Sequence, residues 1–259
     1  MLITKNLRKF FGGIKAVNDV SVSFNRGKIN LIIGPNGSGK TTLVNLLTGF
    51  YKPDSGKILY DPSGSNTYVD ITNLPPEDRV KLGITRSFQI PSPFMRLTVL
   101  ENMLVAYQNN PGENFYKALF KKTWIKQEHS AAEKAFRILK ILSLDHLWDE
   151  YAANLSGGQL KLLELGRALM TDPKLLVLDE PIGSVNPRIA EEILSKIIDL
   201  RDKLHITSII VEHRLDLILD YADYLYVMHE GKIILEGDPK KVINYPIVSE
   251  IYLGEASVR

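Results

Sequence analysis

Residues 29–41 read INLIIGPNGSGKT, an apolar run that stops at Gly34 and leads into a glycine-rich segment ending in Lys40-Thr41. Such a run is typical of a strand buried on both faces, as in a parallel sheet. The segment Gly34–Thr41 matches the pattern Gly-x4-Gly-Lys-Ser/Thr of a phosphate-binding loop without a mismatch. Lys40–Thr48 should form the next helix, with Gly49 as its C-cap. This order of strand, loop and helix predicts a nucleotide-binding α/β core; a glycine-rich turn without a ligand is the alternative.

The residue types of the loop suit the binding of a nucleoside triphosphate. Glycines let successive backbone N–H groups turn inward around phosphates, where a Cβ would collide. Lys40 would bring a cation to the β- and γ-phosphates, and the hydroxyl of Thr41 could ligate Mg²⁺. The positive end of the following helix dipole also favours an anion. The loop therefore predicts that a nucleoside triphosphate and Mg²⁺ bind here. The residues expected to bind them here are Gly34, Pro35, Asn36, Gly37, Ser38, Gly39, Lys40, Thr41 and Thr42.

Composition limits the class of protein. The chain has 259 residues, 44% hydrophobic and 24% charged, which is typical of a globular protein. Its net charge is +2, with 32 basic and 30 acidic residues, so we expect no nucleic acid partner. With no cysteine, disulfides and thiolate metal sites are excluded. Neither a run of about 18 apolar residues nor a signal peptide is found. Any membrane role should therefore be peripheral and depend on partner proteins.

The pattern of apolar residues divides the chain into an α/β core and a helical insertion. The predicted strands outside the loop are Val20–Asn25, Lys57–Tyr60, Leu175–Leu178, Thr207–Val211, Tyr224–Met228 and Lys232–Glu236. Arg188–Lys203 should be a helix, and the middle third is almost all helical. There Thr98 and Glu101 predict a capping box, Ser130–Leu142 a helix, and Asn109–Lys126 an insertion of uncertain structure. We expect one domain, with residues 1–96 and 160–259 as the core and 97–159 as the helical subdomain.

Two acids follow the buried strand Leu175–Leu178. Burying an unpaired carboxylate is costly, so a charged pair at this place needs a reason. In a parallel α/β sheet the carboxyl ends of the strands form the ligand crevice. Asp179 would then hold Mg²⁺, directly or through water, and Glu180 would orient and polarise an attacking water. The alternative is a plain strand-ending turn, since Pro181 follows at once.

A further motif, Leu155-Ser156-Gly157-Gly158-Gln159, is not general among phosphate-loop proteins. Together with the loop and the acid-ended strand, it makes the chain resemble the ATP-binding subunit of ABC transporters along nearly its whole length. The resemblance implies ATP hydrolysis by a fold with a mixed sheet, an antiparallel β subdomain and a helical subdomain. Ser156, Gly157 and Gly158 should open a helix, Gln159–Met170, and offer a second anion site; an ordinary helix N-cap is the alternative.

By the same resemblance, two ATPase subunits pair head to tail, as a homodimer or a paralogous heterodimer. Each ATP would lie between Lys40 of one subunit and Ser156, Gly157, Gly158 and Gln159 of the other. Three more positions match the family. Gln89 would touch Mg²⁺ and link the core to the insertion, and His213 would contact the γ-phosphate, acting with Lys40 and Glu180 in catalysis. Phe11 would stack on adenine, although Phe10 could serve instead and core packing is an alternative for both.

One position departs from the family. Between Glu180 and the next helix, where aspartate is usual, the segment Gly183–Pro187 carries Asn186. Asparagine keeps a hydrogen-bonding amide and loses the charge. Asn186 could therefore take part in communication across the dimer through its amide, but not through the charge of the usual aspartate.

Local segments indicate the kind of transporter. Residues 11–17, 83–89 and 251–255 are similar to those of branched-chain amino acid importers, whose longer ATPase subunit also carries an insertion like 109–126. The ATPase of lipopolysaccharide export is the alternative. Transmembrane permease subunits would dock between Gln89 and Leu100, where Pro91, Pro93, Phe94 and Met95 offer apolar contacts, unless these residues pack within the domain. The chain would then work at the cytoplasmic face of the cell membrane.

Other classes with the same ATPase head fit less well. A DNA-repair ATPase needs a long heptad-patterned coiled coil, and Leu97–Leu155 is too short and irregular for one. Ribosome-associated relatives usually fuse two heads, whereas the sequence holds one Lys40-type loop. Glu180 and His213 argue against a module that binds ATP without hydrolysing it.

Overall fold

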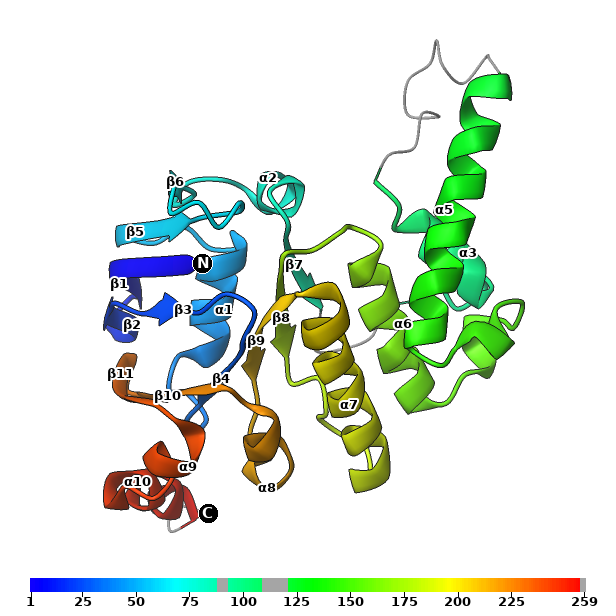
Figure 1. The fold of residues 1–259 in the computed structure, drawn as a ribbon. Helices are drawn as coiled ribbons and strands as arrows, with labels where there is room; N and C mark the ends of the chain where they lie inside the picture. Colours follow the sequence, from blue (N-terminus) through cyan, green and yellow to red (C-terminus); the bar gives the residue numbers. More distant parts are fainter. Residues whose placement is uncertain (88–92, 109–120, 257–259) are drawn as a thin grey trace. The chain divides into compact units, whose positions relative to one another are not determined.

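The computed structural model describes residues 1–87, 93–108 and 121–256, and its chain contacts divide it into two compact units. The first unit is Met1–Gln89 with Lys174–Arg259, and the second is Ile90–Pro173. Figure 1 shows the elements of each. The second unit extends beyond the predicted helical subdomain, residues 97–159, at both ends. At its C-terminal end it includes the whole of helix α6 (Gly157–Leu169).

A six-stranded sheet forms the centre of the first unit, in the order β11-β10-β4-β9-β8-β7. Its neighbours are parallel from β10 to β7, and β11 is antiparallel to β10. Every residue of β4, β8 and β9 is buried, as predicted for strands covered on both faces. Because these strands are parallel, their carboxyl ends share one edge of the sheet. The bounds are β4 Ile29–Ile33, β7 Ile84–Ser87, β8 Leu175–Asp179, β9 Thr207–Val211, β10 Tyr224–His229 and β11 Lys232–Gly237.

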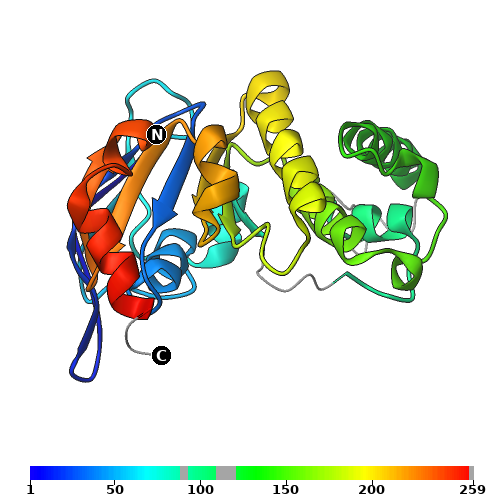
Figure 2. The same cartoon turned by 90° about the horizontal axis from the view of Figure 1, so that it is seen from below.

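Helices cover both faces of this sheet. Helix α1 (Lys40–Thr48) contacts β7 and β8 on one side and β2 on the other, and Gly49 ends it in the left-handed conformation, as predicted. Helix α7 (Pro187–Leu204) covers the opposite face, as Figure 2 shows. The chain moves along the sheet in opposite directions after β4 and after β8, so right-handed crossovers place the two helices on opposite sides.

A five-stranded antiparallel sheet packs on the other side of α1. Its path is β2-β1-β5-β6, with β3 paired to β1. The strands are β1 Leu2–Phe11, β2 Ile14–Val20, β3 Ser23–Phe24, β5 Ser55–Tyr60 and β6 Val69–Asp70. One apolar core joins both sheets through α1, with Leu43, Val44, Leu46 and Leu47 fully buried in it. The loop at Asp61–Asn66 lies at the end of the β5–β6 hairpin.

The predicted strand Val20–Asn25 is wrong in its bounds. The alternation is present, since Val20, Val22 and Phe24 are buried, but the ladder breaks between β2 and β3. The hydroxyl of Thr4 accounts for the break, because it donates to the carbonyl of Val20 and accepts from the N–H of Val22, both at 3.0 Å. A side chain thus replaces one rung of the ladder.

The second unit is helical. It holds α3 (Val99–Val105), α5 (Lys121–Ile141) and α6, with short 3₁₀ turns at Asp145–Leu147 and Ala152–Asn154. The capping box at Thr98 and Glu101 is confirmed in both directions. Helix α5 begins at Lys121 rather than at Ser130 and ends at Ile141. Its residues Ala135 and Leu139 are fully buried, as is Leu142 in the turn that follows. The rest of the predicted insertion, residues 109–120, lies outside the described residues.

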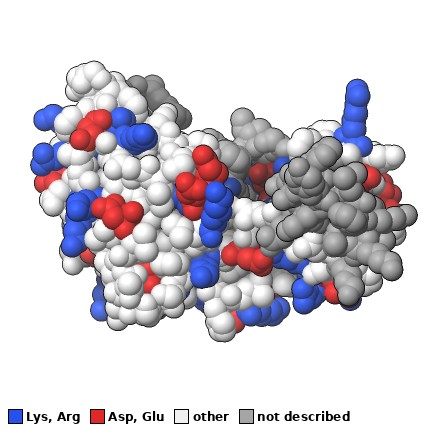
Figure 3. Space-filling view, turned by 90° about the horizontal axis from the view of Figure 1, so that it is seen from above, with Lys and Arg blue, Asp and Glu red and all other residues white. Residues whose placement is uncertain are grey.

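Short helices complete the first unit: α2 Pro76–Lys81, α8 Leu215–Ile218, a 3₁₀ turn at Leu219–Tyr221, α9 Pro239–Val242 and α10 Pro246–Ala256. Within the described ranges, no helix has the length and apolar character needed to cross a membrane. Figure 3 shows acidic and basic side chains interspersed over the visible face, in line with the nearly equal counts of 30 and 32 in the sequence.

Arg79 on α2 stabilises the carboxyl end of α1. Its side chain is buried, at 1% exposed, and donates to the carbonyls of Leu46 and Leu47 at 2.6 and 2.8 Å. It also donates to the carbonyls of Thr72 and Leu74. Burial lowers the pKa of Arg79 to about 10, which leaves the guanidinium charged at neutral pH. Arg79 therefore satisfies helix-end carbonyls that have no partner within the helix.

We expect Arg79→Met to lower the free energy of unfolding by about 2–4 kcal/mol, because it leaves several buried carbonyls without a donor. Urea denaturation followed by circular dichroism measures the change. Arg188→Met on the exposed surface of α7 is the matched control and should stay within about 0.5 kcal/mol of the parent. Equal stabilities for the two variants would contradict this role of Arg79.

Candidate nucleotide-binding site

The loop between β4 and α1 is shaped by close backbone contacts. A Cβ on Gly34 would lie 2.0 Å from the carbonyl oxygen of Met228, and one on Gly39 would lie 2.0 Å from that of Ala16. Gly39 also has a φ of 104°, which disfavours any other residue. The Gly34 and Gly39 positions thus require glycine because backbone from other strands lies against them. The loop prediction is correct in its local structure.

Lys40 folds back into this loop. Its side chain is almost fully buried, and its ammonium donates to the carbonyls of Gly34 and Pro35 at 2.8 and 2.7 Å. The hydroxyl of Ser38 lies 3.4 Å away. These contacts hold a cation inside a ring of backbone at the N-terminus of α1, which is the electrostatic setting that a phosphate group needs.

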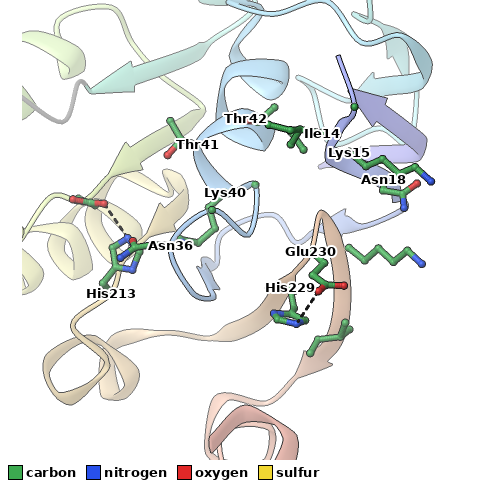
Figure 4. A pocket seen from close by; sticks show the side chains of 17 residues that line it. Ile14, Lys15, Asn18, Asn36, Lys40, Thr41, Thr42, His213, His229 and Glu230 are labelled. Atoms are coloured by element: carbon green, nitrogen blue, oxygen red, sulfur yellow. Dashed lines mark ion pairs between the residues drawn. The ribbon is translucent and has the colours of Figure 1, made fainter. Parts of the chain in front are cut away.

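A cavity of about 720 Å³ opens beside the loop, as Figure 4 shows. Its size suits a nucleotide. Loop residues 36–37 and 39–42 line one side, and Gly13–Ala16 with Asn18 line another. Glu180 and His213 complete the phosphate end, and the β10–β11 turn brings His229, Glu230 and Lys232 to the far end. Asn36, Gly37, Gly39, Lys40, Thr41 and Thr42 of the predicted set line the cavity, while Gly34, Pro35 and Ser38 support it through Lys40.

Glu180 and His213 meet across this cavity. They follow β8 and β9, neighbouring parallel strands, and Oε1 of Glu180 lies 3.0 Å from Nε2 of His213. Both side chains are partly exposed, so a substrate can reach them. Glu180 has a left-handed backbone with a φ of 52°. A non-glycine residue in that conformation is under strain, which is common at functional sites. The structure brings together the two residues that the sequence singled out separately.

Asp179 is 2% exposed and forms an ion pair with Arg86 of β7, with Nη2 and Oδ2 2.8 Å apart. Burial raises the pKa of Asp179, and the nearby Arg86 opposes that shift. Arg86 also bonds to the side chain of Asn45 on α1. Arg86 was not predicted as a site residue from the sequence. The sequence shows a basic residue within a short strand, but only the strand order, with β7 beside β8, places that residue next to Asp179.

Phe10 and Phe11, the two candidates for stacking on adenine, lie outside the lining of the cavity. Phe10 and Phe11 end β1 and are 37% and 42% exposed, so neither is buried in the core. The ring of Phe11 packs edge-on against Tyr51, with centroids 5.5 Å apart. Gln89 lies outside the described residues. Its predicted contact with Mg²⁺ remains a prediction.

In the second unit, Ser156 caps α6. Its hydroxyl accepts from the N–H of Gln159 at 3.3 Å, and the Gln159 side chain accepts from the N–H of Ser156 at 2.8 Å. Ser156 and Gly157 are exposed, and Gly158 is buried within the first turn. Asn186 likewise caps α7 by accepting from the N–H of Ile189. Both residues satisfy helix-end N–H groups, and the exposed start of α6 is open to a partner.

The fold and the site define a phosphate-loop nucleotide-binding protein with a carboxylate and an imidazole beside the loop. Residues 17–183 match the sequence profile of the ABC transporter family. The probable branched-chain amino acid transport ATP-binding protein LivG of Archaeoglobus fulgidus is 50% identical, over 98% of this chain and 95% of its own length. The protein of the same name from Methanocaldococcus jannaschii is 49% identical, over 98% of both chains.

A crystal structure described as the ADP conformation of an ATP-binding cassette of an ABC transporter matches with a TM-score of 0.83 and 47% identity, over 98% of each chain. The chain therefore belongs to the ABC transporter family, as one of its nucleotide-binding ATPase cassettes. The resemblance drawn from the motifs is confirmed.

We expect Lys40→Ala to weaken ATP binding at least about tenfold, because it removes the cation from the phosphate end of the cavity. Titration with a fluorescent ATP analogue measures the dissociation constant. Lys240→Ala, an exposed lysine on α9, is the matched control and should bind as the parent does. Retained affinity in Lys40→Ala would remove Lys40 from the site.

Proposed function

We propose that this chain hydrolyses ATP at the Gly34–Thr41 loop to drive the import of branched-chain amino acids by a membrane complex. The pairing of Glu180 with His213 at the phosphate end of the cavity carries the catalytic part of the proposal. A site that only binds nucleotide needs the loop but has no use for a carboxylate base held beside an imidazole.

Each residue of the site has a distinct part in hydrolysis. Lys40 donates to the β- and γ-phosphate oxygens in place of the Gly34 and Pro35 carbonyls. Glu180 accepts a hydrogen bond from the attacking water and polarises it. His213 holds Glu180 in position and contacts the γ-phosphate, where negative charge is redistributed in the transition state. Most of the catalysis is positioning and electrostatic stabilisation, as in other phosphoryl transfers.

Mg²⁺ fits the oxygen groups near the loop. Thr41 presents an exposed hydroxyl in the cavity, and Asp179 lies at the end of β8. Among the described residues, no cluster of three or more His, Cys, Asp or Glu side chains could hold a metal alone. Mg²⁺ commonly takes one or two protein ligands and fills its remaining positions with phosphate oxygens and water. Thr41, Asp179 and Gln89 would therefore hold the ion, which neutralises phosphate charge when bound.

A second ATPase subunit would complete each site. The chain carries one phosphate loop and one Ser156–Gln159 segment, and these belong to different compact units. The exposed N-terminus of α6 offers N–H groups to the γ-phosphate of an ATP bound by the partner. The partner would be a second copy of this chain or a paralogue of it.

The cargo is inferred from relatives. Both proteins described above are named for branched-chain amino acid transport, and each aligns over at least 95% of its length. These names favour amino acid import over the alternative of lipopolysaccharide export. The chain would work peripherally, at the cytoplasmic face of the membrane, bound to permease subunits that span it.

The docking surface for those permeases would include Phe94 and Met95, which are 49% and 47% exposed. Asn102 of α3 fixes this segment, since its buried amide bonds to the N–H and carbonyl of Phe94 and to the carbonyls of Leu97 and Thr98. The backbone is thus held rigid while two apolar side chains face outward. They do not pack within the domain core, and an amphipathic helix of the permease could cover them. Of the predicted docking region, residues 89–92 lie outside the described residues.

Glu180→Gln should turn ATP over at least about a hundredfold more slowly and still bind it, because glutamine keeps the shape but cannot act as a base. A coupled phosphate-release assay measures turnover, and gel filtration with ATP should show the variant as a closed dimer. Glu191→Gln, an exposed acid on α7, is the control. Chelating Mg²⁺ should abolish turnover in the parent. Unchanged turnover in Glu180→Gln would remove Glu180 from its role.

Met95→Asp should reduce the ATP turnover that a leucine-loaded binding protein elicits from the assembled transporter in liposomes, because it places a charge on the docking surface. Leu204→Asp, at a similarly exposed aliphatic position on α7, is the control. If leucine elicits no response from the parent assembly, the cargo is wrong. If Met95→Asp responds like the parent, the docking surface is wrong.

A further inference from the structure

Glu212, directly before His213, is a carboxylate buried in the first unit at 1% exposed. Its Oε1 accepts from the N–H of Ile182 at 2.8 Å, and its Oε2 accepts from the N–H of His213 at 3.0 Å. The backbone of Arg214 also bonds to it. The Glu212 side chain therefore accepts hydrogen bonds from the N–H groups of two separate turns.

Those two turns carry the catalytic pair. Ile182 belongs to the turn that follows Glu180, and the N–H groups of His213 and Arg214 belong to the turn after β9. Two other contacts join the same turns. The N–H of Glu180 donates to the carbonyl of Val211 at 2.9 Å, and the guanidinium of Arg214 donates to the carbonyl of Val185 at 2.8 Å. In sequence, Glu212 lies between Val211 and Arg214, the residues that make these two contacts.

A buried carboxylate needs a reason, since burial alone disfavours its charged form. Burial raises the pKa of Glu212, while the N–H groups of Ile182, His213 and Arg214 oppose the shift. An apolar side chain would fill the space at lower cost but could not accept from the two turns. Because the carboxylate accepts hydrogen bonds from both turns, it fixes the distance between them.

Resting on the proposed hydrolysis of ATP, we propose that Glu212 is a positioning residue that holds the two turns so that Glu180 and His213 face each other. Glu180 has a left-handed backbone, a conformation that persists only where surrounding contacts impose it. The bond from Ile182 to Glu212 fixes the chain two residues beyond Glu180. The bond from His213 to Glu212 fixes the backbone of the imidazole itself. The 3.0 Å contact between the catalytic pair depends on both.

The position of Glu212 separates this role from nucleotide binding. Its carboxylate does not line the nucleotide cavity, and its bonds run to the turns after β8 and β9 rather than to residues 34–42. Loss of the carboxylate should therefore disturb the geometry of hydrolysis and leave the phosphate loop in place. The expected effect is a lower kcat at unchanged ATP affinity.

Glu212→Gln tests the proposal with little change in shape. Its amide has one oxygen, so it can accept from one turn, and its NH₂ group faces an N–H of the other. We expect kcat to fall about tenfold or more, since small displacements of catalytic groups cost rates of that order. The dissociation constant of ATP should stay within about twofold of the parent. Glu192→Gln, an exposed acid on α7, is the matched control and should change neither quantity.

A crystal structure of Glu212→Gln gives a readout that general destabilisation would not produce. The distance between Oε1 of Glu180 and Nε2 of His213 should exceed hydrogen-bonding range, about 3.5 Å. A normal kcat, or a lowered kcat with the pair still in contact, would overturn the proposal. Failure of the parent itself to hydrolyse ATP would instead overturn the proposed function.

Glu212→Asp provides a second test if Glu212→Gln does not fold. Aspartate keeps the charge, but its side chain is one methylene shorter, so its carboxylate cannot reach the N–H groups of Ile182 and His213 together. We expect kcat to fall several-fold at unchanged ATP affinity. An unchanged kcat in Glu212→Asp would show that the bonds to both turns do not govern the rate, which would overturn the proposal.

Discussion

Direct backbone contact around the phosphate loop is the constraint on which the site depends. The N–H of Gly231, in the β10–β11 turn, donates to the carbonyl of Ser38, and the carbonyl of Gly231 accepts from the N–H of Asn18. A Cβ on Gly231 would lie 2.5 Å from the carbonyl oxygen of Lys15. The loop, the end of β2 and a turn near the end of the chain are thus joined without intervening side chains. This contact fixes both walls of the nucleotide cavity and ties the antiparallel sheet to the central one.

Parallel strand order then determines which side chains reach the loop. Because β4, β9 and β8 are adjacent and parallel, their carboxyl ends bring Gly34, His213 and Glu180 to one edge. These strands are entirely buried and end abruptly, so the sequence predicts them from an apolar run followed by polar residues. Glu180 was predicted because two acids end such a run. His213 also follows an apolar run, but its role was inferred from the family resemblance.

Other features depended on contacts that no local pattern records. Strands β1 and β2 were not predicted from the sequence. The pairing of β1 is irregular, and its residue Asn6 has a left-handed conformation, which disrupts the alternation of a regular strand. The break at Thr4 shifted the bounds of the predicted strand at Val20–Asn25 for a similar reason. Arg86 and Glu212 were missed because their partners, Asp179 and Ile182, lie on other elements. By contrast, the capping box at Thr98 is local in sequence and was predicted completely.

The charged groups of the site already have partners within the protein, which affects how substrate binding should be understood. Lys40 bonds to two loop carbonyls, Asp179 to Arg86, and Glu180 to His213. Binding of ATP therefore exchanges one set of hydrogen bonds for another, and the affinity reflects only the difference between them. Such an exchange couples the phosphate end of the cavity to β7, because a ligand that binds Asp179 must weaken the ion pair between Asp179 and Arg86.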